Sequence, residues 1–152
     1  MKIAIGADHA GFELKEKLKQ HLAAKGASVT DCGTRSAESV DYPDFARAVG
    51  EEVAGRQADF GVLVCGSGIG MAIAANKVPG IRAANVSSAE AARLSREHND
   101  ANVLTLGARL LDAQNAQEIL DAWLAASFAG GRHLQRVEKI AHLESAAAHA
   151  RK

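Results

Sequence analysis

The chain has 152 residues, of which 47% are hydrophobic and 24% are charged. This length predicts one domain, residues 1–152, with a core large enough to form without disulfides or bound metals. Lysine plus arginine balance aspartate plus glutamate at 18 each. We therefore expect no basic surface for nucleic acid or for an acidic membrane, and the partner should be a small molecule.

The start of the chain and its cysteines predict a cytoplasmic protein. Residues 1–6 form a strand-length apolar piece that lacks the longer apolar stretch of a signal peptide, and no run of 18 apolar residues could cross a membrane. The two cysteines, Cys32 and Cys65, have no CxxC spacing and make a poor disulfide framework. Free thiols of this kind suit a reducing compartment.

Strand-like and helical segments alternate along the chain. This alternation is typical of an α/β fold, in which helices cover both faces of a parallel sheet. The expected strands are residues 2–6, 27–31, 60–65, 81–86 and 103–106. The expected helices are residues 12–24, 43–54, 69–76, 89–97, 113–128 and 134–148, the last being a C-terminal helix whose lead-in begins at about residue 132.

Residues 59–77 are the most informative segment. Cys65 ends a short β-branched strand, and Gly66, Gly68 and Gly70 open the helix that follows. Such a turn can point backbone N–H groups outward, and the helix dipole adds positive potential, so the junction can hold an anion and favours a thiolate. A buried cysteine is more often inert, but the position at a strand end favours a reactive Cys65.

The same glycines have two plainer explanations. They could only permit close packing of the helix on the sheet. They could also belong to a dinucleotide site, yet the spacing is GxGxG and the next strand ends near Ser87 and Ser88 without the acidic residue that such a site needs. Ser67 could cap the helix, contact a ligand, or do both.

Other polar side chains follow the ends of elements that lead to the same edge of the predicted sheet. Ligands collect at the carboxyl ends of parallel strands, so we expect the polar chemistry on one edge. The side chains concerned are Asp8 and His9 after the first strand, His98 and Asn99 at the end of the helix after the fourth, and Arg109 after the fifth.

Each of these has an alternative without chemistry. His98 suits a helix C-terminus and Asn99 suits a C-cap, so a structural and a functional interpretation are equally good. Arg109, Arg132 and Arg136 could be surface ion-pair partners or, together, a clamp for phosphate oxygens. The histidines and carboxylates do not have metal-ligand spacing, so no metal is expected.

Five segments of the sequence together resemble the ribose-5-phosphate isomerase B family over nearly the whole chain. The resemblance implies a three-layer α/β/α sandwich around a five-stranded parallel sheet of Rossmann-like type. It also implies a homodimer or homotetramer with active sites where subunits meet, and a reaction without a redox cofactor or a metal. The segments are GADHAGFELK at 6–15, DYPDFA at 41–46, CGSGIGMAIAANKVPGIRA at 65–83, SREHNDANVLTLGAR at 95–109 and GGRHLQRV at 130–137.

The resemblance also implies residue roles. Cys65 matches the base that removes the proton next to the carbonyl, His98 matches the residue that opens the sugar ring, and Ser67 stands beside the oxygens between which a proton moves. The implied substrate contacts are Asp8, His9, Gly66, Ser67, Gly68, Ile69, Gly70, Asn99, Arg109, Arg132 and Arg136.

These roles predict interconversion of ribose 5-phosphate and ribulose 5-phosphate through an enediolate. Two other functions stay open at this point. The first is isomerisation of a six-carbon phosphate, allose or galactose 6-phosphate. The second is a noncatalytic phosphate- or nucleotide-binding module in which Cys65 is a packing residue.

Overall fold

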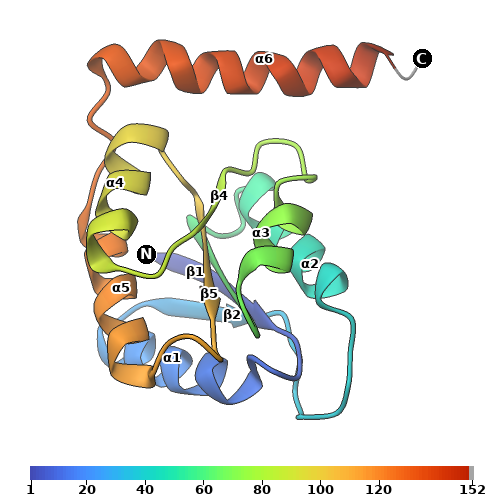
Figure 1. Cartoon of the computed structure of the whole chain (residues 1–152), viewed down its shortest axis with the longest axis vertical. Helices are drawn as coiled ribbons and strands as arrows, with labels where there is room; N and C mark the ends of the chain where they lie inside the picture. Colours follow the sequence, from blue (N-terminus) through green and yellow to red (C-terminus); the bar gives the residue numbers. More distant parts are fainter. Residues whose placement is uncertain (151–152) are drawn as a thin grey trace.

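A computed structural model describes residues 1–150 of the chain. Five strands form one sheet in the order β2-β1-β3-β5-β4, and every neighbouring pair is parallel (Figure 1). The expected five-stranded parallel sheet is confirmed. The strands are β1 Lys2–Ala7, β2 Ser28–Asp31, β3 Phe60–Cys65, β4 Ala83–Asn85 and β5 Val103–Gly107.

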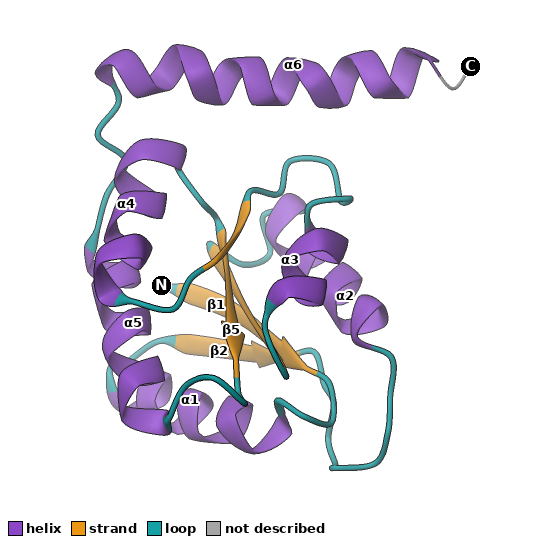
Figure 2. Ribbon diagram, viewed as in Figure 1, coloured by secondary structure: helices purple, strands orange, loops and turns teal. Residues whose placement is uncertain are grey.

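Helices cover both faces of this sheet, as Figure 2 shows, so the expected three-layer sandwich is also confirmed. Helices α1, α4 and α5 pack on one face, and α2 and α3 pack on the other. The helices are α1 Phe12–Ala24, α2 Tyr42–Ala54, α3 Ile69–Ala75, α4 Ala89–Asn99, α5 Ala113–Ala125, a 3-10 turn at Gly131–His133 and α6 Leu134–Ala150.

The central strands are buried on both faces, which explains their nearly continuous apolar sequences. In β3, Val62 and Val64 point into the core under α1 and α5, whereas Leu63 and Cys65 point into the core under α2 and α3. Burial of each of these valine and leucine side chains contributes about 1.5–3 kcal/mol to the free energy of folding. The alternation along the strand therefore fixes the face on which the Cys65 thiol lies.

Several element ends differ from the prediction. The strand expected at 81–86 covers only Ala83–Asn85, because the Arg82 N–H donates to the Asn102 side chain (2.8 Å) rather than to a strand. Helix α4 runs two residues further than expected. Helix α5 ends at Ala125, three residues early, and the extended chain after it crosses the end of α4, where the Ala129 N–H donates to the Glu97 carbonyl (3.0 Å).

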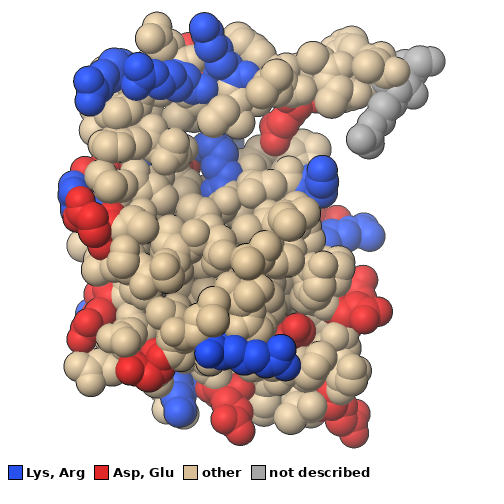
Figure 3. Space-filling view, in the orientation of Figure 1, with Lys and Arg blue, Asp and Glu red and all other residues tan. Residues whose placement is uncertain are grey.

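Helix α6 is set apart from the sandwich and none of its residues is buried (Figure 1). Its apolar side chains Leu134, Ile140 and Leu143 are exposed, and the Glu144 carboxylate accepts the Gly80 N–H (3.0 Å). A groove of about 580 Å³ lies between α6 and the β4 edge of the sandwich, visible as a hollow in Figure 3. Within residues 1–150, no helix has the length and apolar character needed to span a membrane.

Candidate active site

The turn between β3 and α3, which we call the glycine nest, places a backbone donor against the Cys65 sulfur. Cys65 is 5% exposed, and the Gly68 N–H donates a hydrogen bond to its Sγ over 3.1 Å. Gly68 has a φ of +79°, and a Cβ there would lie 2.4 Å from the Asn85 side-chain oxygen. Only glycine fits this position, so the sequence sets the donor that faces the sulfur.

Ser67 lies between the cysteine and the helix. Its hydroxyl oxygen accepts the Ile69 N–H (3.2 Å), while the N-cap position itself belongs to Gly68. A hydroxyl that accepts one hydrogen bond still carries a hydrogen to donate. Ser67 can therefore support the turn and donate to a ligand oxygen at the same time.

The end of β5 brings a positive charge to the nest. The Ala108 N–H donates to the Cys65 carbonyl (2.8 Å) and the Arg109 N–H donates to the Gly66 carbonyl (3.0 Å). The approach needs Gly107, because a Cβ there would lie 2.7 Å from the Ser67 backbone. The Arg109 guanidinium lies beside Gly66, 3.0 Å from where a Cβ would stand. The Arg109 guanidinium and the Gly68 N–H thus lie at the same turn as the Cys65 sulfur.

A cavity of about 560 Å³ opens at this edge of the sheet. Several expected site residues share it, and three residues that were not among the expected substrate contacts complete its wall: Tyr42, Ile73 and Leu110. The Tyr42 ring packs on Gly70, where a Cβ would come within 2.6 Å of the ring. An exposed tyrosine directly before a proline at a helix start was the available signal. The lining residues are Asp8, Tyr42, Cys65, Gly66, Ser67, Ile69, Gly70, Ile73, Arg109 and Leu110.

Asp8 and His9 lie at the end of β1, as expected. Asp8 is buried, and its carboxylate accepts the Gly11 N–H (3.0 Å). His9 does not line the cavity, and its Nδ1 accepts the Val40 N–H (3.2 Å) from the loop before α2. That bond places the hydrogen of the neutral ring on Nε2. The ring therefore offers a donor with a fixed tautomer.

The prediction that all the polar chemistry lies on one edge is wrong for His98 and Asn99. Helix α4 returns along the sheet towards the starts of the strands, so its last residues lie at the amino edge (Figure 1). The segment after it joins that edge, where the Gly61 N–H donates to the Asn102 carbonyl (2.9 Å). The sequence pattern did not predict this location, because the helix between two parallel strands runs back from the carboxyl edge of the sheet to the amino edge.

His98 instead joins a second polar cluster at the base of α6. Its ring stacks on the ring of His133, with centroids 4.3 Å apart and planes 14° apart. Arg132 precedes His133, and Arg136 follows in the first turn of α6. None of the four lines the cavity at Cys65. Figure 3 shows lysine and arginine side chains over this half of α6.

The charge of this second cluster favours anions. Partial burial lowers the pKa of His133, and the positive charges of His98, Arg132 and Arg136 lower it further. The positive charges around His133 thus oppose its own protonation. An anion placed among these groups would relieve that repulsion.

The second cysteine has a different environment from Cys65. Burial raises the pKa of Cys32 to about 11, and the nearby charges of Glu52 and Asp31 act in the same direction. Cys32 is therefore a structural thiol, as its place in the sequence indicates. Among residues 1–150, no group of three or more His, Cys, Asp or Glu side chains is placed to hold a metal ion.

Fold and site together define a parallel α/β protein with an open cavity at the carboxyl edge of its sheet, lined by a cysteine, an aspartate and an arginine. The ribose/galactose isomerase family model matches residues 3–140. The chain belongs to this family, and it is an isomerase.

Similar proteins cover nearly the whole chain. Ribose-5-phosphate isomerase B of Escherichia coli is 51% identical over 143 residues, which is 94% of this chain and 96% of that protein. Ribose-5-P isomerase B of Listeria innocua is 43% identical over 144 residues, which is 95% of this chain and 97% of that one. The structure of Clostridium thermocellum ribose-5-phosphate isomerase B has a TM-score of 0.96 at 51% identity, covering 97% of this chain and 99% of that one.

Proposed function

We propose that this chain interconverts ribose 5-phosphate and ribulose 5-phosphate, with Cys65 as the base. The observation that carries the proposal is the Gly68 N–H directed at the Cys65 sulfur, at the wall of a cavity that also holds Asp8 and Arg109. Its relatives at about half identity are named for this reaction.

The sulfur supplies the proton transfer. In the proposed mechanism Cys65 acts as a thiolate, whose sulfur accepts the Gly68 N–H. The thiolate takes the proton from C2 of the open aldehyde, and the resulting thiol returns it to C1. The electron pair left at C2 forms the C1–C2 double bond while the carbonyl oxygen takes up negative charge. No oxidant, metal or redox cofactor enters this balance.

The charge of the enediolate needs preorganised donors. The glycine nest and the Arg109 guanidinium face the same space as the sulfur. The Ser67 hydroxyl, which accepts from Ile69, keeps a hydrogen for the substrate oxygens. It is suited to pass a proton between O2 and O1 as the double bond moves.

Ring opening and phosphate binding require the second cluster. A closed furanose must open before C2 becomes acidic, and His98 is the proposed proton donor. Arg132 and Arg136 are the proposed phosphate ligands, since guanidinium groups match phosphate oxygens. These groups lie at the other edge of the same chain, so the proposal needs a second copy to bring them to Cys65.

Exposed apolar side chains lie beside both the Cys65 cavity and the second cluster, which together we call the two half-sites. Ile69 and Ile73 on α3 are 53% and 60% exposed beside the Cys65 cavity, and Leu134, which follows His133 at the start of α6, is 48% exposed. Burying one patch against the other across two copies would remove both from water and join the half-sites. We propose a homodimer, or a tetramer made of such dimers, of this single domain.

Activity of the purified chain tests the proposal. Ribose, allose and galactose phosphates are assayed in parallel, and iodoacetamide labelling of Cys65 is followed with and without ribose 5-phosphate. We expect turnover of ribose 5-phosphate and protection of Cys65 by that sugar. Preference for a six-carbon phosphate would reassign the substrate. Tight dinucleotide binding without turnover would contradict the proposal. The cytoplasmic location stays a prediction.

A further inference from the structure

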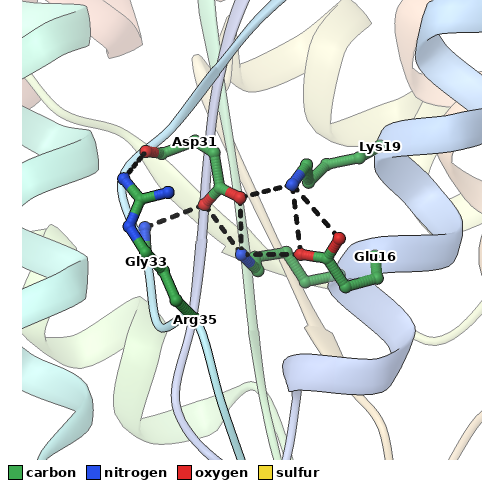
Figure 4. A network of polar contacts seen from close by, with 6 residues as sticks. Glu16, Lys19, Asp31, Gly33 and Arg35 are labelled. Carbon is green, nitrogen blue, oxygen red and sulfur yellow. Dashed lines mark hydrogen bonds and ion pairs between the residues drawn. The ribbon is translucent and has the colours of Figure 1, made fainter.

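Lys15 is a fully buried charge that the proposed chemistry does not use. Its side chain is 0% exposed, and its Nζ donates to both carboxylate oxygens of Asp31 over 2.7 and 2.8 Å. Glu16 lies 3.0 Å away, and Lys19 also reaches the Asp31 carboxylate. Figure 4 shows Asp31 at the centre of these contacts. Burying an ammonium group is costly unless it is paired, so its location needs a reason.

The Asp31 carboxylate connects Lys15 to the turn that follows β2. The Asp31 carboxylate accepts the Gly33 N–H (2.9 Å), and the Arg35 guanidinium donates to the Asp31 carbonyl (3.4 Å). Gly33 has a φ of +99°, and a Cβ there would lie 2.8 Å from the Phe45 ring. The carboxylate thus bonds to a residue whose backbone conformation only glycine adopts without strain.

Backbone hydrogen bonds then join the turn at residues 33–34 to the end of β1. The Ala7 N–H donates to the Gly33 carbonyl and the Thr34 N–H donates to the Ala7 carbonyl, each over 2.7 Å. On the other side, the Asp8 N–H donates to the Val64 carbonyl (3.2 Å), one residue before Cys65. The backbone at residues 7 and 8 is therefore fixed between the turn at 33–34 and the end of β3.

We propose that Asp31, which the buried Lys15 holds, is a positioning residue that acts through the turn at Gly33 and Thr34 to set Asp8 against Cys65 in the cavity. Neither Asp31 nor Lys15 lines the cavity, whereas Asp8 and Cys65 both do. The inference rests on the proposed function, since it concerns the placement of substrate groups for that reaction.

Two double variants separate positioning from plain stabilisation. Lys15→Met/Asp31→Leu replaces the ion pair with apolar groups, which proteins often tolerate without loss of stability. It also removes the acceptor of the Gly33 N–H. Lys15→Met/Asp31→Asn removes the same two charges but keeps a side-chain oxygen for that N–H. The exposed lysine on the same helix gives the matched control Lys17→Met.

We expect kcat/KM for ribose 5-phosphate to fall roughly ten- to a hundred-fold in the leucine variant, because small misplacements of a binding group are expensive. The asparagine variant should keep most of the wild-type value and Lys17→Met all of it, with thermal unfolding measured on each protein. Equal kcat/KM in the two double variants would overturn the positioning role while leaving the isomerase intact. An inactive wild type would overturn the proposed function itself and the inference with it.

Discussion

The two half-sites of this chain are built in different ways. The Cys65 edge is preformed, because backbone hydrogen bonds from β1, β5 and the turn after β2 fix each group before any ligand arrives. The cluster at His98 lies beside α6, a helix with no buried residue. The first can hold a reacting carbon on its own, whereas the second has the character of a surface that another molecule covers. In the proposed dimer, one copy would supply proton transfer at carbon, and its neighbour would supply ring opening and phosphate recognition.

The largest expected effect comes from removing the sulfur. Cys65→Ala should lower kcat at least roughly a thousand-fold, in line with the 10²–10⁴ that a positioned general base contributes. The change removes one atom from a buried site, so the fold should persist, as circular dichroism would show. Cys32→Ala is the matched control and should keep its activity. Retention of more than about a tenth of the wild-type kcat would take Cys65 out of the mechanism.

A smaller but still large effect is expected at Gly68. In Gly68→Ala, the alanine would need a left-handed backbone, and its Cβ would lie 2.4 Å from the Asn85 side-chain oxygen. The Gly68 N–H that donates to the sulfur must therefore move. A displacement of the sulfur and its turn by about 1 Å costs roughly a hundred-fold in kcat. Gly80→Ala is the control, because Gly80 also has a positive φ of +85° but has open space around it.

The Gly80 variant should lose about 1–2 kcal/mol of unfolding free energy for its backbone alone and keep its kcat. Chemical denaturation and steady-state kinetics measure the two quantities. Equal kcat in the Gly68 and Gly80 variants would show that the nest holds no charge in the transition state.

Changes at the second half-site should act on binding. Arg136→Ala removes a proposed phosphate ligand, and loss of a charge-assisted hydrogen bond, about 1.5–3 kcal/mol, corresponds to a KM raised roughly ten- to a hundred-fold. The control is Lys139→Ala on the same helix. An unchanged KM for Arg136→Ala, measured at low salt, would remove Arg136 from the phosphate site.

The smallest expected effect is on stability in acid. Burial alone would raise the pKa of Asp31, but hydrogen bonds from Lys15, Lys19 and the Gly33 N–H outweigh burial and lower it to about 2 from 3.8. A folded-state pKa below the unfolded one means that Asp31 stabilises the fold above about pH 4. This contribution is lost as the pH falls from about 4 to about 2.

Urea unfolding at a series of pH values measures this loss. Asp31→Asn should be less stable than the wild type at neutral pH, and the difference should shrink below pH 4. A difference that stays constant with pH would show that Asp31 is not held by its cations.

Much of this architecture could be predicted from the sequence. The β3–α3 junction was predictable because strand period, cysteine position and glycine spacing all act within a dozen residues. The location of His98 was not, since it depends on the direction in which α4 returns along the sheet. Tyr42 and Lys15 were missed for a related reason. Tyr42 contacts Gly70 and Lys15 contacts Asp31. Both partners lie too far along the chain for a local sequence pattern to predict the contact.

Mixing two inactive variants tests most directly whether the half-sites of separate copies work together. Cys65→Ala and His98→Ala are each assayed for ribose 5-phosphate turnover, then unfolded together, refolded as a mixture and assayed again. If one copy supplies the thiolate and its neighbour the imidazole, random pairing in a symmetric dimer restores about a quarter of the wild-type rate. A mixture no more active than its parts, at a concentration where wild-type chains refolded in the same way recover full turnover, would contradict the account.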